Sequence, residues 1–415
     1  MIEQIQINDW RQFNNLTIDF DKRLTILTGA NGSGKTTILN ILSKAFGESV
    51  KFVSNVSETA DGSIDYTSSV IGDLEEKRDS NYKSSVIGNI TYNSTTSSIL
   101  VPEQVSTTYN IDLKDIKPCK GIYINSHRSL FQYKKVDNIP THALKRDEIF
   151  SAYHKYKTLP LSDTYYNPNE QGATKHIKEA IISLATFGPG NNYVKSNQEA
   201  LDIFEGFQSI LHKILPPKIG FKKLSIEIPE VILETDSGNF PIDAVSGGIA
   251  SIIELAWMIY MYAPFNESFT VLFDEPENHL HPELQQTLLP NLLGAFPNVQ
   301  FIVATHNPFI ISSVESSLIY VLNYTKDNKI GSTLLDNVTK AASSNEILRE
   351  VLGISSTYPL WASSKIDILV RDTIAKGISE ESLSDFRNQM EKFGFSNVIP
   401  TALNQLFEGD SNDKN

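Results

Sequence analysis

A glycine-rich run that ends in Lys-Thr is the part of the sequence whose residue types and spacing point most directly to chemistry. It reads Gly29-Ala30-Asn31-Gly32-Ser33-Gly34-Lys35-Thr36-Thr37 and matches the pattern G-x-x-x-x-G-K-[ST]. An apolar run, 24–27, precedes it, and a helical run, 38–46, follows it. In a strand–loop–helix context the backbone N–H groups of such a loop and the positive end of the helix surround the phosphates of a nucleotide. The pattern assigns Lys35 to the β and γ phosphates and the Thr36 hydroxyl to Mg²⁺.

Acidic side chains follow a second apolar run. Phe269 to Phe273 leads directly into Asp274-Glu275. If the run is a strand whose carboxyl end lies beside the glycine loop, Asp274 suits binding of Mg²⁺, directly or through a water molecule. Glu275 suits orienting and deprotonating an attacking water molecule.

A third apolar run, 300–304, ends in Thr305-His306-Asn307-Pro308. A lone histidine is more often a core residue than a ligand. Here His306 would be a further polar residue at a strand end on the same edge of a sheet, so we predict that it contacts the γ-phosphate.

A Ser-Gly-Gly sequence precedes a helical run. Ser246, Gly247 and Gly248 stand before the run 252–262. A hydroxyl, glycine amides and a helix start make a second anion site, although such turns are common and the signal alone is weak.

The order of these motifs resembles that of ABC-type ATPases of the RecF and overcoming-lysogenization-defect kind, a group that includes ATPase subunits of antiphage systems such as Septu and PARIS. The resemblance covers residues 1–47 and about 215–315. It implies a head that closes on ATP and Mg²⁺ as a head-to-tail dimer, or as a higher oligomer. Ser246, Gly247 and Gly248 of one subunit would then cap the γ-phosphate held by Lys35 and Thr36 of the other.

The sequence departs from the pattern of transporter ATPases in two places. Val245 and Ile249 flank the Ser-Gly-Gly where transporters have Leu and Gln. No glutamine stands clearly at the coupling loop, for which Arg128 and Gln132 are the candidates.

The bulk composition is that of a globular protein and excludes several classes. The chain has 415 residues, 40% hydrophobic content and a net charge of −13. Cys119 is the single cysteine, the N-terminus lacks the order of a signal peptide, and no apolar run is long enough to span a bilayer. We therefore expect a cytoplasmic protein without a membrane partner.

Bases outnumber acids in the segment 114–158, where aromatic residues are interleaved with them. Such a segment could bind nucleic acid, with bases holding phosphate and aromatic rings stacking on the nucleobases. A solvated helix face beside core aromatics is the alternative interpretation, slightly favoured by sequence alone.

The predicted fold class is α/β: an ABC-type P-loop ATPase head with a mixed sheet, an antiparallel β arm, a helical insertion and a C-terminal helical segment. Sustained heptad repeats are missing, which argues against a long coiled-coil arm. The predicted organisation is an ATPase core at 1–47 and 215–325, a β arm at 48–125 that continues the core, a helical insertion at 126–214, C-terminal helices at 326–407 and a disordered acidic tail at 408–415.

The sequence after residue 315 contains neither a strand-ending Glu followed by an Asp-x-Asp pair, as in a Toprim nuclease, nor a His-Asn-His constellation. The chain therefore resembles an ATPase that lacks its own effector. We predict an ATP-hydrolysing sensor or regulatory subunit of an antiphage defence complex, acting with a separate nuclease or toxin. The alternative is a RecF-like DNA-repair ATPase that binds DNA directly. A transporter motor is less favoured because of the segment 276–282 and the missing coupling glutamine.

Overall fold

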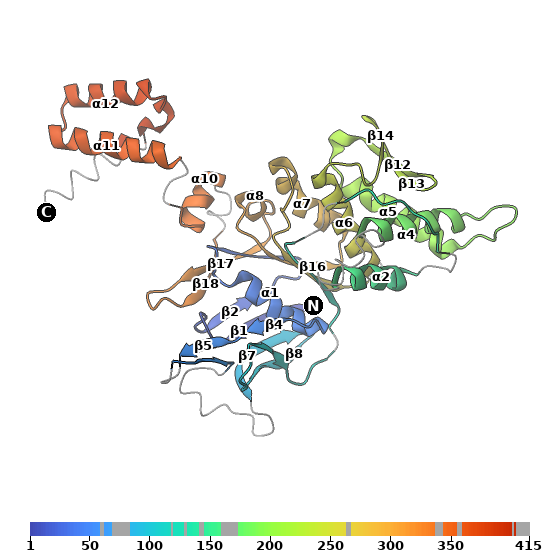
Figure 1. Cartoon of the computed structure of the whole chain (residues 1–415). Helices are drawn as coiled ribbons and strands as arrows, with labels where there is room; N and C mark the ends of the chain where they lie inside the picture. The colour runs from blue at the N-terminus through green and yellow to red at the C-terminus, as the bar shows by residue number, and fades with distance from the viewer. Residues whose placement is uncertain are drawn as a thin grey trace. The chain divides into compact units, whose positions relative to one another are not determined.

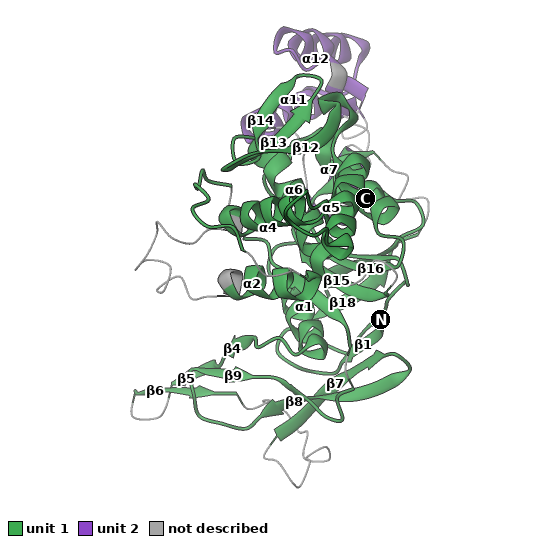
Figure 2. Cartoon of the chain, turned by 90° about the vertical axis from the view of Figure 1, so that its right-hand side faces the viewer, with its two compact units in different colours: residues 1–344 green, residues 345–415 purple. Residues whose placement is uncertain are grey.

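The computed structural model divides the chain into two compact units, residues 1–344 and 345–415, coloured separately in Figure 2. It describes residues 1–58, 62–68, 84–117, 119–127, 131–140, 145–158, 173–262, 267–336, 343–354, 359–400 and 402–403. Each unit has its own hydrophobic core.

A mixed six-stranded sheet lies at the centre of the first unit (Figure 1). Its strand order is β11-β15-β16-β3-β17-β18, and every neighbouring pair is parallel except β17 with β18. All residues of β3, β15 and β16 are buried, as expected for parallel strands covered on both faces. The bounds are β3 (Leu24–Gly29), β11 (Gly121–Ile124), β15 (Phe269–Asp274), β16 (Val299–Ala304), β17 (Leu318–Tyr324) and β18 (Ile330–Leu334).

A five-stranded antiparallel sheet, in the order β10-β8-β7-β1-β2, packs on the other side of helix α1 (Lys35–Ser43). Ile38 and Leu42 of α1 are fully buried in a core shared by the two sheets. The strands β7 and β8 come from the predicted β arm, and β7 pairs with β1. The bounds are β1 (Ile2–Ile7), β2 (Leu16–Asp19), β7 (Ser84–Tyr92), β8 (Thr95–Pro102) and β10 (Asp112–Leu113).

Smaller sheets complete the β structure of this unit. One antiparallel pair consists of β4 (Lys51–Val53) and β9 (Thr108–Asn110), and another of β5 (Asn55–Glu58) and β6 (Ile64–Thr67). A three-stranded sheet contains β12 (Phe221–Glu227), β13 (Glu230–Thr235) and β14 (Gly238–Pro241).

Helices α2, α4, α5, α6 and α7 form a connected layer, in which α6 contacts α2 and α5, and α5 contacts α4 and α7. Helix α6 is buried almost along its whole length, which explains its continuous apolar sequence. The bounds are α2 (Arg146–Thr158), α4 (Ala173–Phe187), α5 (Gln198–Ile214), α6 (Gly247–Tyr262), α7 (Pro282–Ala295) and α8 (Pro308–Ile311), with short 3₁₀ turns η1 (Lys44–Phe46) and η3 (Pro217–Ile219).

The second unit is helical. Its helices α11 (Leu360–Lys376) and α12 (Glu380–Lys392) enclose a small core that includes Ile366, Phe386 and Met390. The π-helical turn η4 (Ile347–Val351) follows the short helix α10 (Ser344–Glu346), which begins at the last residue of the first unit, and the 3₁₀ turn η5 (Ser396–Val398) lies after α12.

The mixed α/β fold, the antiparallel arm and the C-terminal helices agree with the sequence prediction, with one difference. Strand β18 lies in the segment predicted to be helical. This part of the segment is a strand because it pairs with β17 as an antiparallel edge strand. Within the described part of the chain, every helix is too short or too polar to cross a bilayer.

Candidate functional site

The glycine loop connects β3 to α1, as its pattern predicts. Gly29 and Gly34 have φ angles of 134° and 88°, in the region that favours glycine. A Cβ atom at Gly29 would lie 2.4 Å from the Leu322 carbonyl oxygen, and one at Gly34 would lie 2.4 Å from the Phe13 ring. Both positions therefore need glycine for shape as well as for backbone conformation.

The residues of the loop differ in exposure, as a phosphate cradle requires. Ala30, Asn31, Gly32 and Thr36 are exposed, and Thr37 is half-buried in the first turn of α1. Ser33 and Lys35 are buried. Exposed residues of the loop therefore lie next to the start of α1, where the helix dipole favours an anion.

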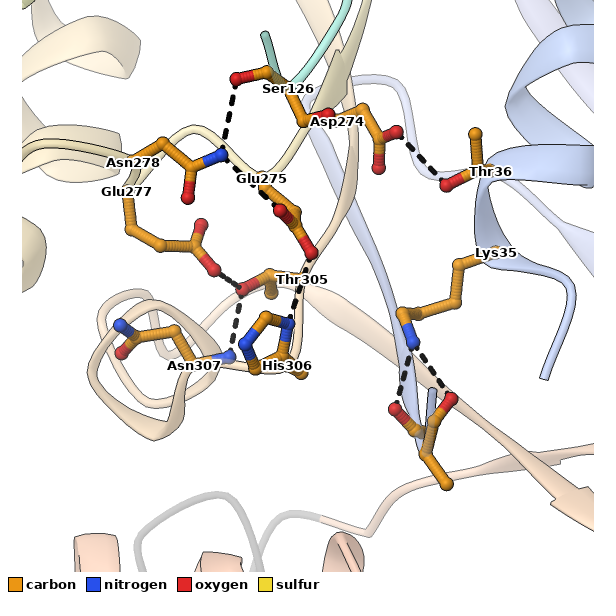
Figure 3. A network of polar contacts seen from close by, with 12 residues as sticks. Lys35, Thr36, Ser126, Asp274, Glu275, Glu277, Asn278, Thr305, His306 and Asn307 are labelled. Atoms are coloured by element: carbon orange, nitrogen blue, oxygen red, sulfur yellow. Dashed lines mark hydrogen bonds and ion pairs between the residues drawn. The ribbon is translucent and has the colours of Figure 1, made fainter. Parts of the chain in front are cut away.

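Lys35 bends back over its own loop. Its Nζ atom donates to the carbonyl oxygens of Gly29, at 2.9 Å, and Ala30, at 3.0 Å (Figure 3). Burial lowers the pKa of Lys35, and the carboxylates of Glu275 and Asp274 counteract this effect. The ammonium group therefore lies between loop carbonyls and acidic groups, in a place where a nucleotide phosphate could exchange for the carbonyl contacts.

Thr36 and Asp274 meet across the site. The Thr36 hydroxyl donates to Asp274 Oδ2 at 2.9 Å. Burial raises the pKa of Asp274, and the Thr36 hydrogen bond opposes this shift. A hydroxyl and a single carboxylate beside a phosphate loop fit Mg²⁺, which takes few protein ligands and completes its shell with water and phosphate oxygens.

Glu275 lies between His306 and Asn278. Its Oε1 is 3.2 Å from His306 Nδ1, and its Oε2 accepts from Asn278 Nδ2 at 3.2 Å. Glu275 has a φ of 45°, a conformation that non-glycine residues rarely adopt and that occurs disproportionately at functional sites. The carboxylate is thus held on both sides at the exposed edge of the site, where it could accept a proton from water.

A buried acid supports the loop that carries His306. Glu277 accepts a hydrogen bond from the Thr305 hydroxyl, and Thr305 Oγ1 accepts from the Asn307 backbone N–H at 2.9 Å. The Asn307 side chain in turn donates to Gln285 at 2.9 Å. Burial raises the pKa of Glu277. This chain of contacts, which sequence reasoning did not assign, orients the backbone on either side of His306; Figure 3 shows its part from Glu277 to Asn307.

The end of β11 contributes a further polar segment that the sequence analysis passed over. The Ser126 carbonyl accepts from Asn278 Nδ2 at 3.1 Å. His127 interacts with Asp274 and slightly opposes the rise in the pKa of Asp274 that burial causes. The sequence signal that could have indicated this segment is an apolar strand run that ends in polar residues, as in β15 and β16. Of the coupling-loop candidates, Gln132 is exposed and Arg128 lies outside the described residues.

The Ser-Gly-Gly residues lie at the start of α6, as predicted. The Ser246 carbonyl accepts the Ala250 N–H at 2.9 Å, which closes the first turn. A Cβ atom at Gly248 would lie 3.3 Å from the His279 carbonyl and 3.4 Å from Leu284. Within the subunit, this helix start therefore packs against the end of the loop that begins after Glu275.

Several residues of the basic segment 114–158 are used inside the unit. Tyr153 is 1% exposed and donates to Glu254 of α6. The Arg146 guanidinium lies 4.0 Å from the centre of the Tyr260 ring. These contacts remove Tyr153 from any stacking surface and favour the solvated-face interpretation, while Lys135 is exposed.

Comparison with known proteins shows the family to which this chain belongs. Residues 24–312 match a family model described as "AAA domain, putative AbiEii toxin, Type IV TA system". The chain is 24% identical to "Retron Ec83 probable ATPase" of Escherichia coli, over 94% of this chain and 86% of that protein. It is 24% identical to "Retron Vc95 probable ATPase" of Vibrio cholerae serotype O1 biovar El Tor, over 78% and 73%. It is 22% identical to "Septu protein PtuA" of Bacillus thuringiensis, over 86% and 85%.

Among solved structures, an Smc head bound to the "C-winged helix domain of ScpA" is 18% identical to this chain. The match covers 81% of this chain and 98% of that one, with a TM-score of 0.42. The SMC head of Thermotoga maritima is 13% identical with a TM-score of 0.40, covering 81% and 99%.

Proposed function

We infer that this chain, which belongs to the AAA-domain family matched above, is an ATPase, and we propose that it is the regulatory subunit of an antiphage defence complex. The observation that carries the ATPase is the meeting of Lys35, Thr36, Asp274, Glu275 and His306 at the carboxyl ends of the neighbouring strands β3, β15 and β16. The convergence of these residue types from distant segments of the sequence is what a nucleotide site requires.

In the proposed reaction each residue has a separate task. Lys35 and the amides of residues 29–37 bind the β and γ phosphates, and Thr36 and Asp274 would hold Mg²⁺, which when bound would neutralise charge on the phosphate oxygens. Glu275, held by Asn278 and His306, orients the attacking water and takes its proton. His306 contacts the γ-phosphate from the neighbouring strand end.

The proposed catalytic unit is a head-to-tail dimer. The start of α6 offers a serine hydroxyl and glycine amides, a set that suits an anion. Within one subunit this start lies against His279, at the end of the loop that follows Glu275. We assign Ser246, Gly247 and Gly248 to the γ-phosphate bound by the partner subunit.

A mixing experiment tests the dimer. A Lys35→Ala subunit has a defective phosphate loop, and a Ser246→Arg subunit has a blocked helix start. Combined, they assemble one composite site with both halves intact, so ATPase activity should reappear although each variant alone is inactive. If both variants dimerise and activity stays absent at every mixing ratio, hydrolysis within a single subunit is the better model.

The proposed output lies in a separate effector, a nuclease or toxin. Support comes from the relatives, which are named as retron ATPases and as a Septu protein. An ATP-driven change of head arrangement does work only when another component is coupled to it. The chain alone should hydrolyse ATP slowly and leave DNA and RNA intact.

Copurification from the native operon tests the effector. The complex should contain a second protein whose activity changes when Glu275 is replaced by Gln. Metal-dependent cleavage of nucleic acid by the isolated chain, retained through repurification and abolished by a point substitution in it, would refute the separate effector.

A further inference from the structure

A lysine ammonium group is buried at the base of the loop that leads to Ser246. The side chain of Lys178, in α4, is 0% exposed. Its Nζ atom donates to Asp243 Oδ2 at 2.8 Å, to Glu230 Oε2 at 2.6 Å and to the Lys134 carbonyl oxygen at 2.9 Å. An ammonium group has three protons to donate, so these acceptors satisfy it completely.

Asp243 connects this lysine to the helix start. It lies in the turn between β14 and α6, shortly before Ser246, and its side chain is 0% exposed. The backbone around it is tied to the three-stranded sheet, since Ile242 N–H donates to Val231 at 2.9 Å. The Asp243 side chain adds a contact in the opposite direction, toward α4 and residues 131–140.

The same polar cluster holds the segment that comes from the edge of the nucleotide site. Lys134 N–H donates to Asp243 Oδ2 at 3.3 Å, and the Tyr133 ring lies 5.2 Å from Lys178 Nζ. Earlier in this stretch of chain, the Ser126 carbonyl accepts from Asn278, which also holds Glu275. The described residues on the two sides of positions 128–130 therefore contact Asn278 at one end and the turn before Ser246 at the other.

Stability alone is a poor explanation for such a cluster. Burial disfavours the charged lysine, but the hydrogen bonds and charges of Asp243 and Glu230 outweigh this effect and raise the pKa of Lys178. Lys178 therefore carries its charge at neutral pH. Well-packed apolar residues in place of a buried ion pair are often equally stable or more so. Directional hydrogen bonds fix the position of the groups that they join, which apolar contacts do not.

We propose that Lys178 is a positioning residue for the partner's ATP site: it fixes the turn that carries Ser246 relative to the segment that starts beside Glu275. This rests on the proposed dimer, in which the helix start of one subunit completes the site of the other. Lys178 thereby acts on the nucleotide bound by the partner subunit, and leaves the phosphate loop of its own subunit unaffected.

Heterodimers with a single working site test this directionality. In the Lys35→Ala and Ser246→Arg pair, the Lys35→Ala subunit supplies the working helix start, and the Ser246→Arg subunit supplies the working phosphate loop. Lys178→Met is added to one subunit or to the other. On the Lys35→Ala subunit it should lower kcat by about tenfold to 100-fold, because small displacements of positioned groups cost rates of that order. On the Ser246→Arg subunit it should leave activity within about twofold of the unaltered pair, a difference of less than roughly 0.5 kcal/mol.

The matched control is Lys175→Met in the same helix, whose Nζ lies 3.8 Å from Glu179. It should have no effect in either subunit. If Lys178→Met does not fold, Asp243→Leu replaces it, since leucine has a similar shape, removes the oxygen that accepts from Lys178 and Lys134, and leaves Lys178 paired with Glu230. It should give the same asymmetry.

Equal losses of activity in both placements would mean that Lys178 only supports the fold. Equal retention of activity would mean that Lys178 has no part in the site. Either result overturns the inference, while the activity of the pair without Lys178→Met still supports the dimer. If the unaltered pair shows no recovery, the proposed dimer fails and the inference fails with it.

Discussion

Replacing Glu275 by Gln tests the chemistry of the site while keeping its geometry. Glu275 Oε2 accepts from Asn278, and Oε1 faces His306 Nδ1. A glutamine can place its carbonyl oxygen toward Asn278 and its NH₂ toward an unprotonated His306 Nδ1. Each hydrogen bond contributes about 1 kcal/mol net. Because both contacts can be kept, we expect the free energy of unfolding to change by less than about 1 kcal/mol.

The expected effect on turnover is much larger. Removal of a positioned general base lowers rates by roughly 10²- to 10⁴-fold. That range corresponds to about 2.7 to about 5.4 kcal/mol of activation free energy. ATP affinity should be retained, since Lys35, Thr36 and Asp274 are untouched, and the nucleotide-bound dimer should accumulate.

The assay combines single-turnover phosphate release, equilibrium ATP binding and size measurement of the nucleotide-bound species. Glu283→Gln is the matched control, because Glu283 lies at the exposed start of α7 and pairs with Lys218. It should turn over ATP like the parent. Turnover by Glu275→Gln within about threefold of the parent, a difference of less than roughly 0.7 kcal/mol, would refute the assignment of Glu275 as the base.

Three further predictions follow from the described contacts. Lys35→Ala should weaken ATP binding about tenfold to 100-fold, the equivalent of roughly 1.5–3 kcal/mol for a hydrogen bond to a charged group, and calorimetry that finds parental affinity would contradict this role. Because burial raises the pKa of Glu277, the folded protein holds that proton more tightly than the unfolded chain, and the ionised carboxylate costs stability above that pKa. Glu277→Gln should therefore raise Tm at pH 7 by roughly 2 °C, for about 1 kcal/mol, and the gain should shrink as the pH falls through the raised pKa toward 4.5; a loss of Tm at pH 7 would count against this reasoning. If residues 114–158 bind duplex DNA, each phosphate contact should add about 0.9 to the slope of log affinity against log salt, and charge reversal at Lys134 and Lys135 should flatten it. Absence of binding at low salt, with and without ATP, would leave the solvated-face interpretation.

The sequence alone determined the local parts of the nucleotide site. The glycine loop and its flanking runs predicted β3 and α1, because only a sharp turn of small residues between a strand and a helix fits that pattern. The apolar runs before Asp274 and Thr305 predicted β15 and β16 for a similar reason: a short, fully apolar run that ends in polar residues is typical of a buried parallel strand.

The tertiary structure decided which distant segments meet. Strand order placed β11 beside β15, which brought Ser126 and His127 to the site, and this order depends on pairing between segments far apart in sequence. The same holds for Tyr153 and Lys178. The local sequences of both residues are compatible with an exposed helix face. In the fold, Glu254 of α6 accepts a hydrogen bond from Tyr153, and Asp243 and Glu230 accept from Lys178. A charged or polar side chain can be buried only where a partner compensates its desolvation, and that partner is supplied by the fold rather than by the neighbouring sequence.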